Sequence, residues 1–145
     1  EELLKNTLQA SENNLVLFWT DWCGASKQRI EKFYKPLIKK IKLEAIDIQL
    51  ILLASDKNIG IEDIEKLRSL GILSYYIPKP GGNAFTNRVA IKSFINKVFP
   101  KNDITQIQKF QFGIPVELLI SNNLEIVNEK EPSISYRFVR DFLKN

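Results

Sequence analysis

The sequence predicts an α/β fold with parallel strands. An apolar run of strand length, Leu15 to Trp19, is followed by a helical pattern, a second apolar run and another helical pattern. This alternation is typical of units in which helices connect parallel strands. Because the first run is apolar throughout, we expect its strand to be covered on both faces by helices.

The composition is that of a globular protein. A length of 145 residues predicts a single domain over 1–145, and 44% hydrophobic with 26% charged residues lies in the ordinary range. The 21 basic and 17 acidic residues are interspersed, with a net charge of +4, so we expect no nucleic-acid partner. No apolar run approaches the roughly 20 residues of a membrane span. The absence of methionine leaves open a leader or membrane anchor upstream of Glu1.

The first half of the chain contains alternating helical and strand patterns. Pro36 lies within a helical pattern and should kink or divide that helix near Phe33 to Lys35. Gly71 is a natural helix stop. The expected elements are a helix over 1–11, a strand over Leu15 to Trp19, a helix that opens at Cys23, a strand over Ala45 to Ser55 and a helix over about Glu62 to Leu70.

In the second half, "YYIPKPGGN" should break regular structure because it contains two prolines and two glycines. Two β-rich runs joined by "SNN" are typical of a hairpin in which the asparagines supply positive φ angles. The expected elements are a helix over Val89 to Phe99, a helix from an N-cap at Asp103 to about Phe110, a hairpin of Val116 to Ile120 with Leu124 to Val127, and a helix over Ser133 to Lys144.

The motif "FWTDWCGAS" contains Cys23, the only cysteine of the chain. At a helix N-terminus a thiolate is stabilised by unpaired backbone N–H groups and by the helix dipole. Positive side chains follow in the next turns: Lys27, Arg29 and Lys32. A lone cysteine is usually a small buried hydrophobe. The position of Cys23 on a loop after a buried strand, between Trp22 and Gly24, favours a reactive thiol instead.

One cysteine cannot form an internal disulfide, and the chain contains no histidine. The cysteine and histidine pattern of a structural zinc site is therefore missing. We expect neither a metal nor a cofactor.

The run "LVLFW" followed by "TDWCGAS" and Lys27 resembles the thioredoxin superfamily, whose signature is a strand ending in Phe-Trp, a short loop and Trp-Cys-x-x-Cys-Lys. "FGIPVELLISNNLEIV", Phe112 to Val127, is similar to the Gly-x-Pro segment that these proteins place before a strand and a hairpin. The resemblance implies a thioredoxin-like fold, a central mixed sheet flanked by helices. It also implies a cis peptide bond between Ile114 and Pro115, facing Cys23.

Within the superfamily, the long stretch before Pro115 is most similar to the extracytoplasmic TlpA/ResA type. That likeness implies a helical insertion at about 80–103, before the cis-proline strand. It further implies an extracytoplasmic protein in a bacterium, periplasmic or membrane-anchored. Its partners would be thiols and disulfides of exported proteins, with a separate reducing or oxidising redox partner, and we expect a monomer.

The activity implied is thiol-disulfide exchange, with Cys23 as the nucleophile and position 26 as the resolving site. The implied substrate platform consists of Trp22, Gly24, Ala25, Ile114 and Pro115. Two acids of the family are absent at their usual places. Thioredoxins have a buried Asp where this chain has Leu17, and some TlpA/ResA-type proteins have a Glu where it has Arg29.

Ser26 stands where the second thiol would be. A serine hydroxyl forms no disulfide, so the chain as written can capture a partner through Cys23 but needs an external thiol to release it. Either Ser26 replaces a natural cysteine, or the protein is a natural monothiol. The alternative function is a redox-inactive binding module. A peroxidase is disfavoured: Thr20 precedes Cys23 at the spacing of peroxiredoxins, but Val16 stands where they have a proline.

Overall fold

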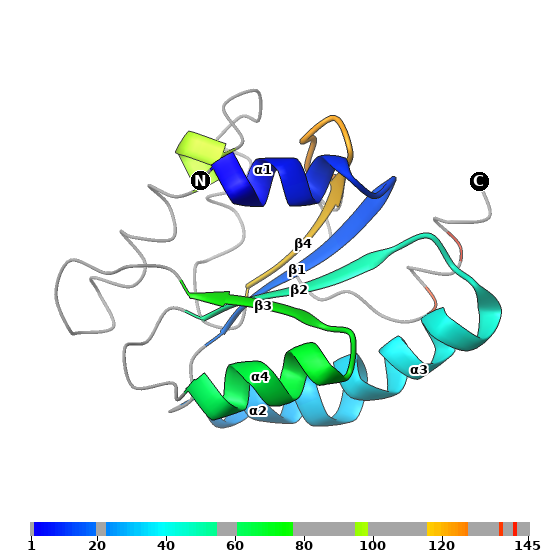
Figure 1. Ribbon diagram of the computed structural model, residues 1–145, viewed down its shortest axis with the longest axis vertical. Helices are drawn as coiled ribbons and strands as arrows, with labels where there is room; N and C mark the ends of the chain where they lie inside the picture. Colours follow the sequence, from blue (N-terminus) through cyan, green and yellow to red (C-terminus); the bar gives the residue numbers. More distant parts are fainter. Residues whose placement is uncertain are drawn as a thin grey trace, which may run out of the picture.

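A mixed four-stranded sheet forms the centre of the molecule (Figure 1). The computed structural model describes residues 2–19, 23–54, 61–76, 95–98, 116–127, 137 and 141. The strands lie in the order β3-β2-β1-β4; β1 is parallel to β2, β2 is parallel to β3, and β4 is antiparallel to β1. Their bounds are Asn13–Trp19 for β1, Gln49–Ala54 for β2, Leu73–Tyr76 for β3 and Val116–Ser121 for β4. The expected α/β class with a mixed sheet is confirmed.

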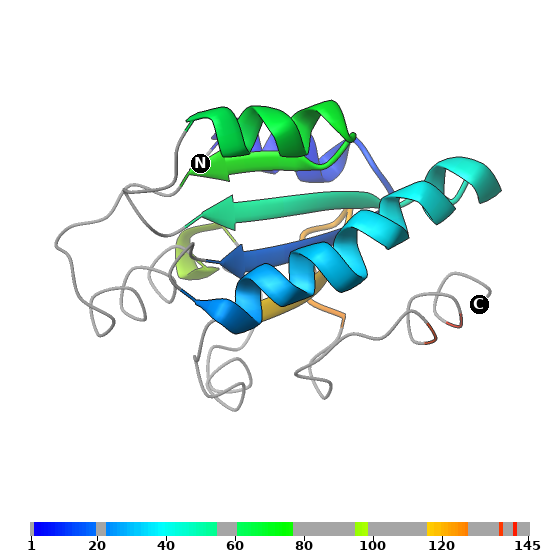
Figure 2. The same cartoon turned by 90° about the horizontal axis from the view of Figure 1, so that it is seen from below.

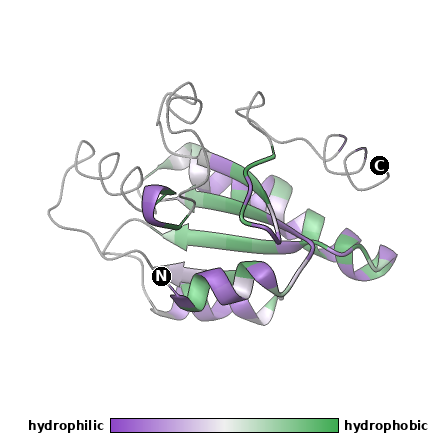
Figure 3. Cartoon of the chain, turned by 90° about the horizontal axis from the view of Figure 1, so that it is seen from above, coloured by the Kyte–Doolittle hydropathy of each residue, from purple (hydrophilic) through white to green (hydrophobic). Residues whose placement is uncertain are grey.

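Helices cover both faces of the sheet, as the apolar strand pattern predicts. Helix α1 and the helical residues 95–98 pack on one face, and the remaining helices pack on the other (Figures 1 and 2). In Figure 3 the strands are predominantly hydrophobic, whereas the helices mix hydrophobic and hydrophilic residues. The helices are α1 Glu2–Gln9, α2 Gly24–Arg29, the π-helical turn η1 Ile30–Tyr34, α3 Lys35–Glu44 and α4 Ile61–Ser69.

Strand β1 supplies both halves of the core, because successive strand residues point to opposite faces. Leu15, Leu17 and Trp19 pack against η1, α3 and α4. Val16 and Phe18 pack against α1 and the residues of 95–98. All five are at most 5% exposed. Burial of this kind stabilises the fold by about 1.5 to 3 kcal/mol for each large side chain.

Strand β3 corrects one expectation. "YYIPKPGGN" does not break regular structure at its first two residues, since Tyr75 and Tyr76 belong to β3 and pair with Leu53 and Ala54. A strand of four residues is too short to show a clear period in the sequence. Its pairing with β2 decides its conformation.

The boundaries of β2 and of the hairpin also differ from expectation. Strand β2 begins at Gln49, four residues later than expected. Ala45, expected to open this strand, instead adopts a left-handed conformation, φ 50° and ψ 44°, and ends α3. In the hairpin, Ile126 forms a single bridge to Ile120. The positive φ of that turn belongs to Leu124, at 63°, so the assignment of this role to the asparagines is wrong.

Several expected elements lie mostly outside the described residues. Of the insertion at about 80–103, residues 95–98 are helical, with Ile95 and Val98 buried. The expected helix from Asp103 to about Phe110 lies entirely outside. In the last helix, Arg137 and Asp141 are described, and both are helical. No helix within the described ranges is both long and apolar enough to span a bilayer.

Candidate functional site

Cys23 lies where the sequence places it, at the start of a helix. It is the N-cap of α2, with an extended backbone at φ −90° and ψ 108°, and its side chain is partly exposed. The backbone N–H of Lys27 donates a hydrogen bond to the Cys23 carbonyl at 3.1 Å. The thiol is therefore carried on the first turn of a helix packed on the sheet.

The sheet register identifies the edge to which this helix is attached. Strand β1 ends at Trp19, and Phe18 pairs with Val116, near the start of the antiparallel strand β4. The end of β1 and the beginning of β4 thus share one edge. Of the expected site residues, Trp22, Ile114 and Pro115 lie outside the described residues; Ile114 and Pro115 directly precede Val116 in the chain.

Gly24 and Ala25 form the exposed surface of the first helical turn after Cys23. A Cβ placed on Gly24 would meet no atom within 4 Å. The packing of the helix therefore leaves room for a side chain at position 24. Any need for a glycine there has to come from something that approaches Cys23 from outside.

Ser26 faces inward and is fully buried, at 0% exposure. Its hydroxyl oxygen has no hydrogen-bond partner among the described residues. A buried hydroxyl without a partner costs about 1 to 3 kcal/mol. A thiol is a weaker donor and behaves as a small hydrophobe, so it loses less in the same place. The environment of position 26 suits a cysteine better than a serine.

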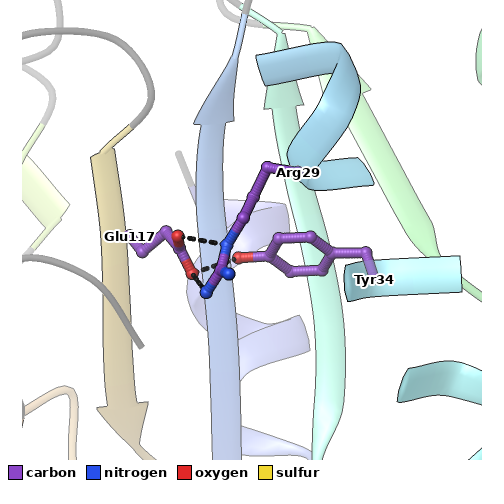
Figure 4. Close-up of polar contacts among 3 residues, drawn as sticks. All are labelled: Arg29, Tyr34 and Glu117. Atoms are coloured by element: carbon purple, nitrogen blue, oxygen red, sulfur yellow. Dashed lines mark hydrogen bonds and ion pairs between the residues drawn. The ribbon is translucent and has the colours of Figure 1, made fainter. Parts of the chain in front are cut away.

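A buried polar cluster connects the helix that begins at Cys23 to strand β4 (Figure 4). Arg29 donates from Nε to Oε1 of Glu117 at 2.6 Å and from Nη2 to Oε2 at 3.1 Å. The Tyr34 hydroxyl donates to Oε2 at 3.0 Å. Glu117 is 4% exposed, so its carboxylate has lost most of its hydrogen bonds to water. Two hydrogen bonds from Arg29 and one from Tyr34 replace them.

The surroundings of Tyr34 keep its hydroxyl protonated. Burial raises the pKa of Tyr34 well above its ordinary value of 10.0, and the Glu117 carboxylate raises it further through its charge and through the hydrogen bond. The Arg29 guanidinium acts in the opposite direction on the same pKa. Tyr34 is therefore a permanent donor to Glu117 across the neutral range.

The π-helical turn explains how Arg29 and Tyr34 both reach one carboxylate. They are five residues apart, which places them on different sides of a regular α-helix, at about 100° per residue. The wider turn Ile30–Tyr34, closed by the Lys35 N–H bonding to the Ile30 carbonyl, brings them toward the same side. This turn ends at Tyr34, two residues before Pro36, which has no N–H to donate. The expected division of the helix is found here, although the ribbon continues into α3 (Figure 2).

Sequence reasoning missed Glu117. Its signal is a single charged residue inside the apolar strand "VELLIS", where period two puts it on the same face as buried Leu119. In the sheet it is paired directly with Leu17. Arg29, expected to add positive charge near Cys23, instead has its charge balanced by Glu117. The buried acid Glu117 thus contacts Arg29 and lies opposite Leu17, the two positions where the sequence resemblance would place an acid.

A groove of about 330 Å³ lies between α4 and the helix that begins at Cys23. Its size is at the lower end of small-ligand sites. Lys27, in the turn that follows Cys23, is part of its lining. The apolar lining consists of Trp19, Ile30, Leu67 and Leu70, and the charged lining consists of Lys27, Glu31, Lys35, Asp63 and Lys66.

Known structures with the same arrangement identify the fold. A thiol:disulfide interchange protein from Bacteroides sp. matches 97% of this chain and 78% of its own, with 15% identity and a TM-score of 0.56. A candidate thiol-disulfide oxidoreductase from Bacteroides vulgatus matches 92% and 77%, with 18% identity and a TM-score of 0.54. The chain has a thioredoxin-like fold.

A third structure with this thioredoxin-like fold is the pneumococcal exposed lipoprotein thioredoxin from Streptococcus pneumoniae, which matches 97% of this chain and 88% of its own. Its identity is 13% and its TM-score 0.50. No protein-family model and no curated protein matches the sequence. Recognition of the thioredoxin-like fold therefore rests on structure and on the motif around Cys23.

Proposed function

We propose that this protein is a thiol-disulfide oxidoreductase that attacks protein disulfides through Cys23. The observation that carries the proposal is the position of Cys23 as the N-cap of α2, at the sheet edge where β1 ends and β4 begins. Backbone N–H groups at a helix N-terminus stabilise a thiolate, the form of the thiol that reacts. The names of two structural neighbours, an interchange protein and a candidate oxidoreductase, support the same chemistry.

In the proposed reaction, the Cys23 thiolate attacks one sulfur of a substrate disulfide. A new disulfide forms between Cys23 and that sulfur, the substrate disulfide breaks, and the other substrate sulfur leaves as a thiolate. A thiol at position 26 would then attack Cys23 and release the reduced substrate. With Ser26, release requires an external thiol.

The proposed substrate platform surrounds Cys23. It consists of Trp22, Gly24, Ala25, Ile114 and Pro115, where an extended segment would lie across the first helical turn and the residues before β4. The open space at Gly24 supports this assignment, since the fold itself does not need a glycine there. We propose exported proteins as the substrates, with an extracytoplasmic location; the lipoprotein thioredoxin among the neighbours supports this.

The Ser26 hydroxyl is buried and finds no hydrogen-bond partner within the described ranges, which favours the hypothesis that Ser26 replaces a cysteine. A binding module is the second candidate function, and the single cysteine of the chain is the observation that favours it. The two functions differ in turnover. An oxidoreductase becomes catalytic once a second thiol is restored, whereas a binding module does not.

The test compares the chain with its Ser26→Cys variant in the reduction of insulin disulfides by dithiothreitol. We expect Ser26→Cys to accelerate this reduction well above the parent chain. With dithiothreitol omitted, the reduced parent chain should capture one insulin sulfur in a stable mixed disulfide with Cys23, without turnover. Cys23→Ala in the Ser26→Cys background is the control and should abolish both. If Ser26→Cys is folded but accelerates the reaction no more than this control, the oxidoreductase assignment is wrong and the binding module is favoured.

A further inference from the structure

Glu117 links the two parts of the chain that meet in the proposed site. It lies two residues after Pro115, and its partner Arg29 lies six residues after Cys23. The contact spans 88 positions of sequence and joins strand β4 to the helix that begins at Cys23 (Figure 4). It is the kind of contact that sets the position of one element against another.

The geometry of the cluster leaves little freedom. A guanidinium that binds a carboxylate through two parallel N–H groups fixes both a distance and an orientation, whereas a single hydrogen bond fixes mainly a distance. Tyr34 supplies a third contact from the other end of the π-helical turn. The Arg29 guanidinium also lies over the Phe33 ring, 3.7 Å from its centroid. This cation–π contact further restricts the position of the guanidinium.

The position of the charged pair is unfavourable for stability alone. A buried ion pair contributes little net stability compared with apolar side chains of the same size, because both charges lose their hydration. Leu17, directly opposite Glu117, is apolar, so an apolar residue at 117 would suit this face of the sheet. We therefore expect the cluster of Arg29, Tyr34 and Glu117 to have a role other than stabilising the core.

We propose that Glu117 is a positioning residue for disulfide exchange, which acts through Arg29 and Tyr34 to hold the Cys23 helix at a fixed place on strand β4. The inference rests on the proposed function. A substrate segment that contacts both Cys23 and the residues before β4 requires these two elements in one fixed relation. A small disulfide that contacts only the Cys23 sulfur does not.

The test uses two activated disulfides with the same leaving group. One is an extended peptide whose central cysteine is joined to thionitrobenzoate, and the other is N-acetylcysteine methylamide joined to the same group. The Cys23 thiolate attacks the cysteine sulfur, the bond to thionitrobenzoate breaks, and thionitrobenzoate leaves with the electron pair as a coloured thiolate. The chain with Ser26 serves directly, since one thiol suffices.

We expect the parent chain to react faster with the peptide than with the small disulfide. Glu117→Gln and Arg29→Lys should slow the peptide reaction about tenfold while changing the small-disulfide reaction less than about twofold, because a small displacement of the helix affects only a substrate that contacts both elements. Tyr34→Phe should have the same effect in a smaller degree. Glu44→Gln removes an exposed carboxylate at the end of α3 and should leave both rates unchanged.

A folded variant with an unchanged preference for the peptide would overturn the inference, and so would an equal loss of both rates. Circular dichroism before each assay shows whether a variant is folded. If Glu117→Gln does not fold, Tyr34→Phe carries the test, since it keeps the ring and removes only the hydroxyl. A parent chain that reacts no faster with the peptide than with the small disulfide rejects the proposed function itself. A parent preference that the variants retain rejects only the positioning role.

Discussion

Arg29 and Glu117 form a two-point ion pair, with N to O distances of 2.6 and 3.1 Å, between the helix that begins at Cys23 and strand β4. Arg29 is 22% exposed and Glu117 4% exposed. By contrast, the ion pair of Lys35 with Glu31 lies within one helix and is more exposed. An exposed pair of that kind contributes at most about 0.5 kcal/mol. The buried pair is the one whose disruption should be visible in stability.

Glu117→Ala should lower the free energy of unfolding by about 3 kcal/mol, since it leaves the Arg29 guanidinium and the Tyr34 hydroxyl without their acceptor. The double variant Arg29→Met with Glu117→Leu should lose much less, because both charges are removed together. Urea unfolding of the parent, Glu117→Ala and the double variant measures this difference. Equal losses in Glu117→Ala and in the double variant would contradict the account.

Tyr34→Phe should change the dependence of stability on pH. The folded-state pKa of Tyr34 is raised above 10.0, first by burial and then by Glu117. The stability that the protonated Tyr34 hydroxyl contributes to the folded state is therefore fully present below about pH 10. It is lost as the pH rises toward the folded-state pKa, by up to about 1.4 kcal/mol per pH unit. Urea unfolding between pH 8 and about pH 11 should show a steeper loss for the parent than for Tyr34→Phe. Identical slopes would show that the phenol is not held protonated.

Ser26→Cys should stabilise the reduced protein by about 1 kcal/mol, because it removes a buried hydroxyl that has no partner in the part of the chain that the structure describes. Thermal unfolding under a reductant excludes any contribution from a disulfide. Ser26→Ala is the matched control and should also be stabilising or neutral, since it removes the same unsatisfied group. A clear loss of stability in both variants would mean that the hydroxyl does have a partner.

Gly24→Ala should separate stability from reactivity. The site leaves open space for a methyl group, so we expect a gain of about 0.5 kcal/mol from the reduced freedom of the unfolded chain. The same methyl group lies on the surface beside Cys23 and should slow the attack on protein disulfides. Insulin capture by Cys23, compared with that of the parent, measures the second effect.

Gly71→Ala is the contrasting control for this prediction. Gly71 has a φ of +90°, and a Cβ there would lie 3.0 Å from Cε and Nζ of Lys42. It should destabilise the protein by about 1 kcal/mol without changing the reactivity of Cys23. If Gly24→Ala is instead as destabilising as Gly71→Ala, position 24 has a structural role that the open space does not show.

Local sequence patterns sufficed for most elements near the site. The apolar run at Leu15 to Trp19 predicts the buried strand, and the spacing after Cys23 predicts both the helix and its first residue, because these features depend on neighbours a few residues away. The position of Pro36 predicts where the helix departs from regular α-helical geometry, in the π-helical turn η1. The sequence also predicts that Gly71 stops this helix; α4 ends at Ser69, and Gly71 has a φ of 90°.

Local sequence patterns failed to predict the features whose conformation depends on distant segments of the chain. Strand β3 is too short to have a recognisable period, and its conformation is set by pairing with β2. The turn after β4 has its positive φ at Leu124 instead of at the asparagines, because the register of the hairpin selects the residue.

The sequence by itself determined the fold class, the strand before the site and the position of Cys23 on a helix N-terminus. Only the tertiary structure decided that Ser26 is buried with no hydrogen-bond partner among the described residues, and that Glu117 binds Arg29 and Tyr34. The physical reason is that burial and ion pairing depend on which segments the sheet register brings together. Arg29 and Glu117 are 88 positions apart, and no pattern within either segment specifies the other.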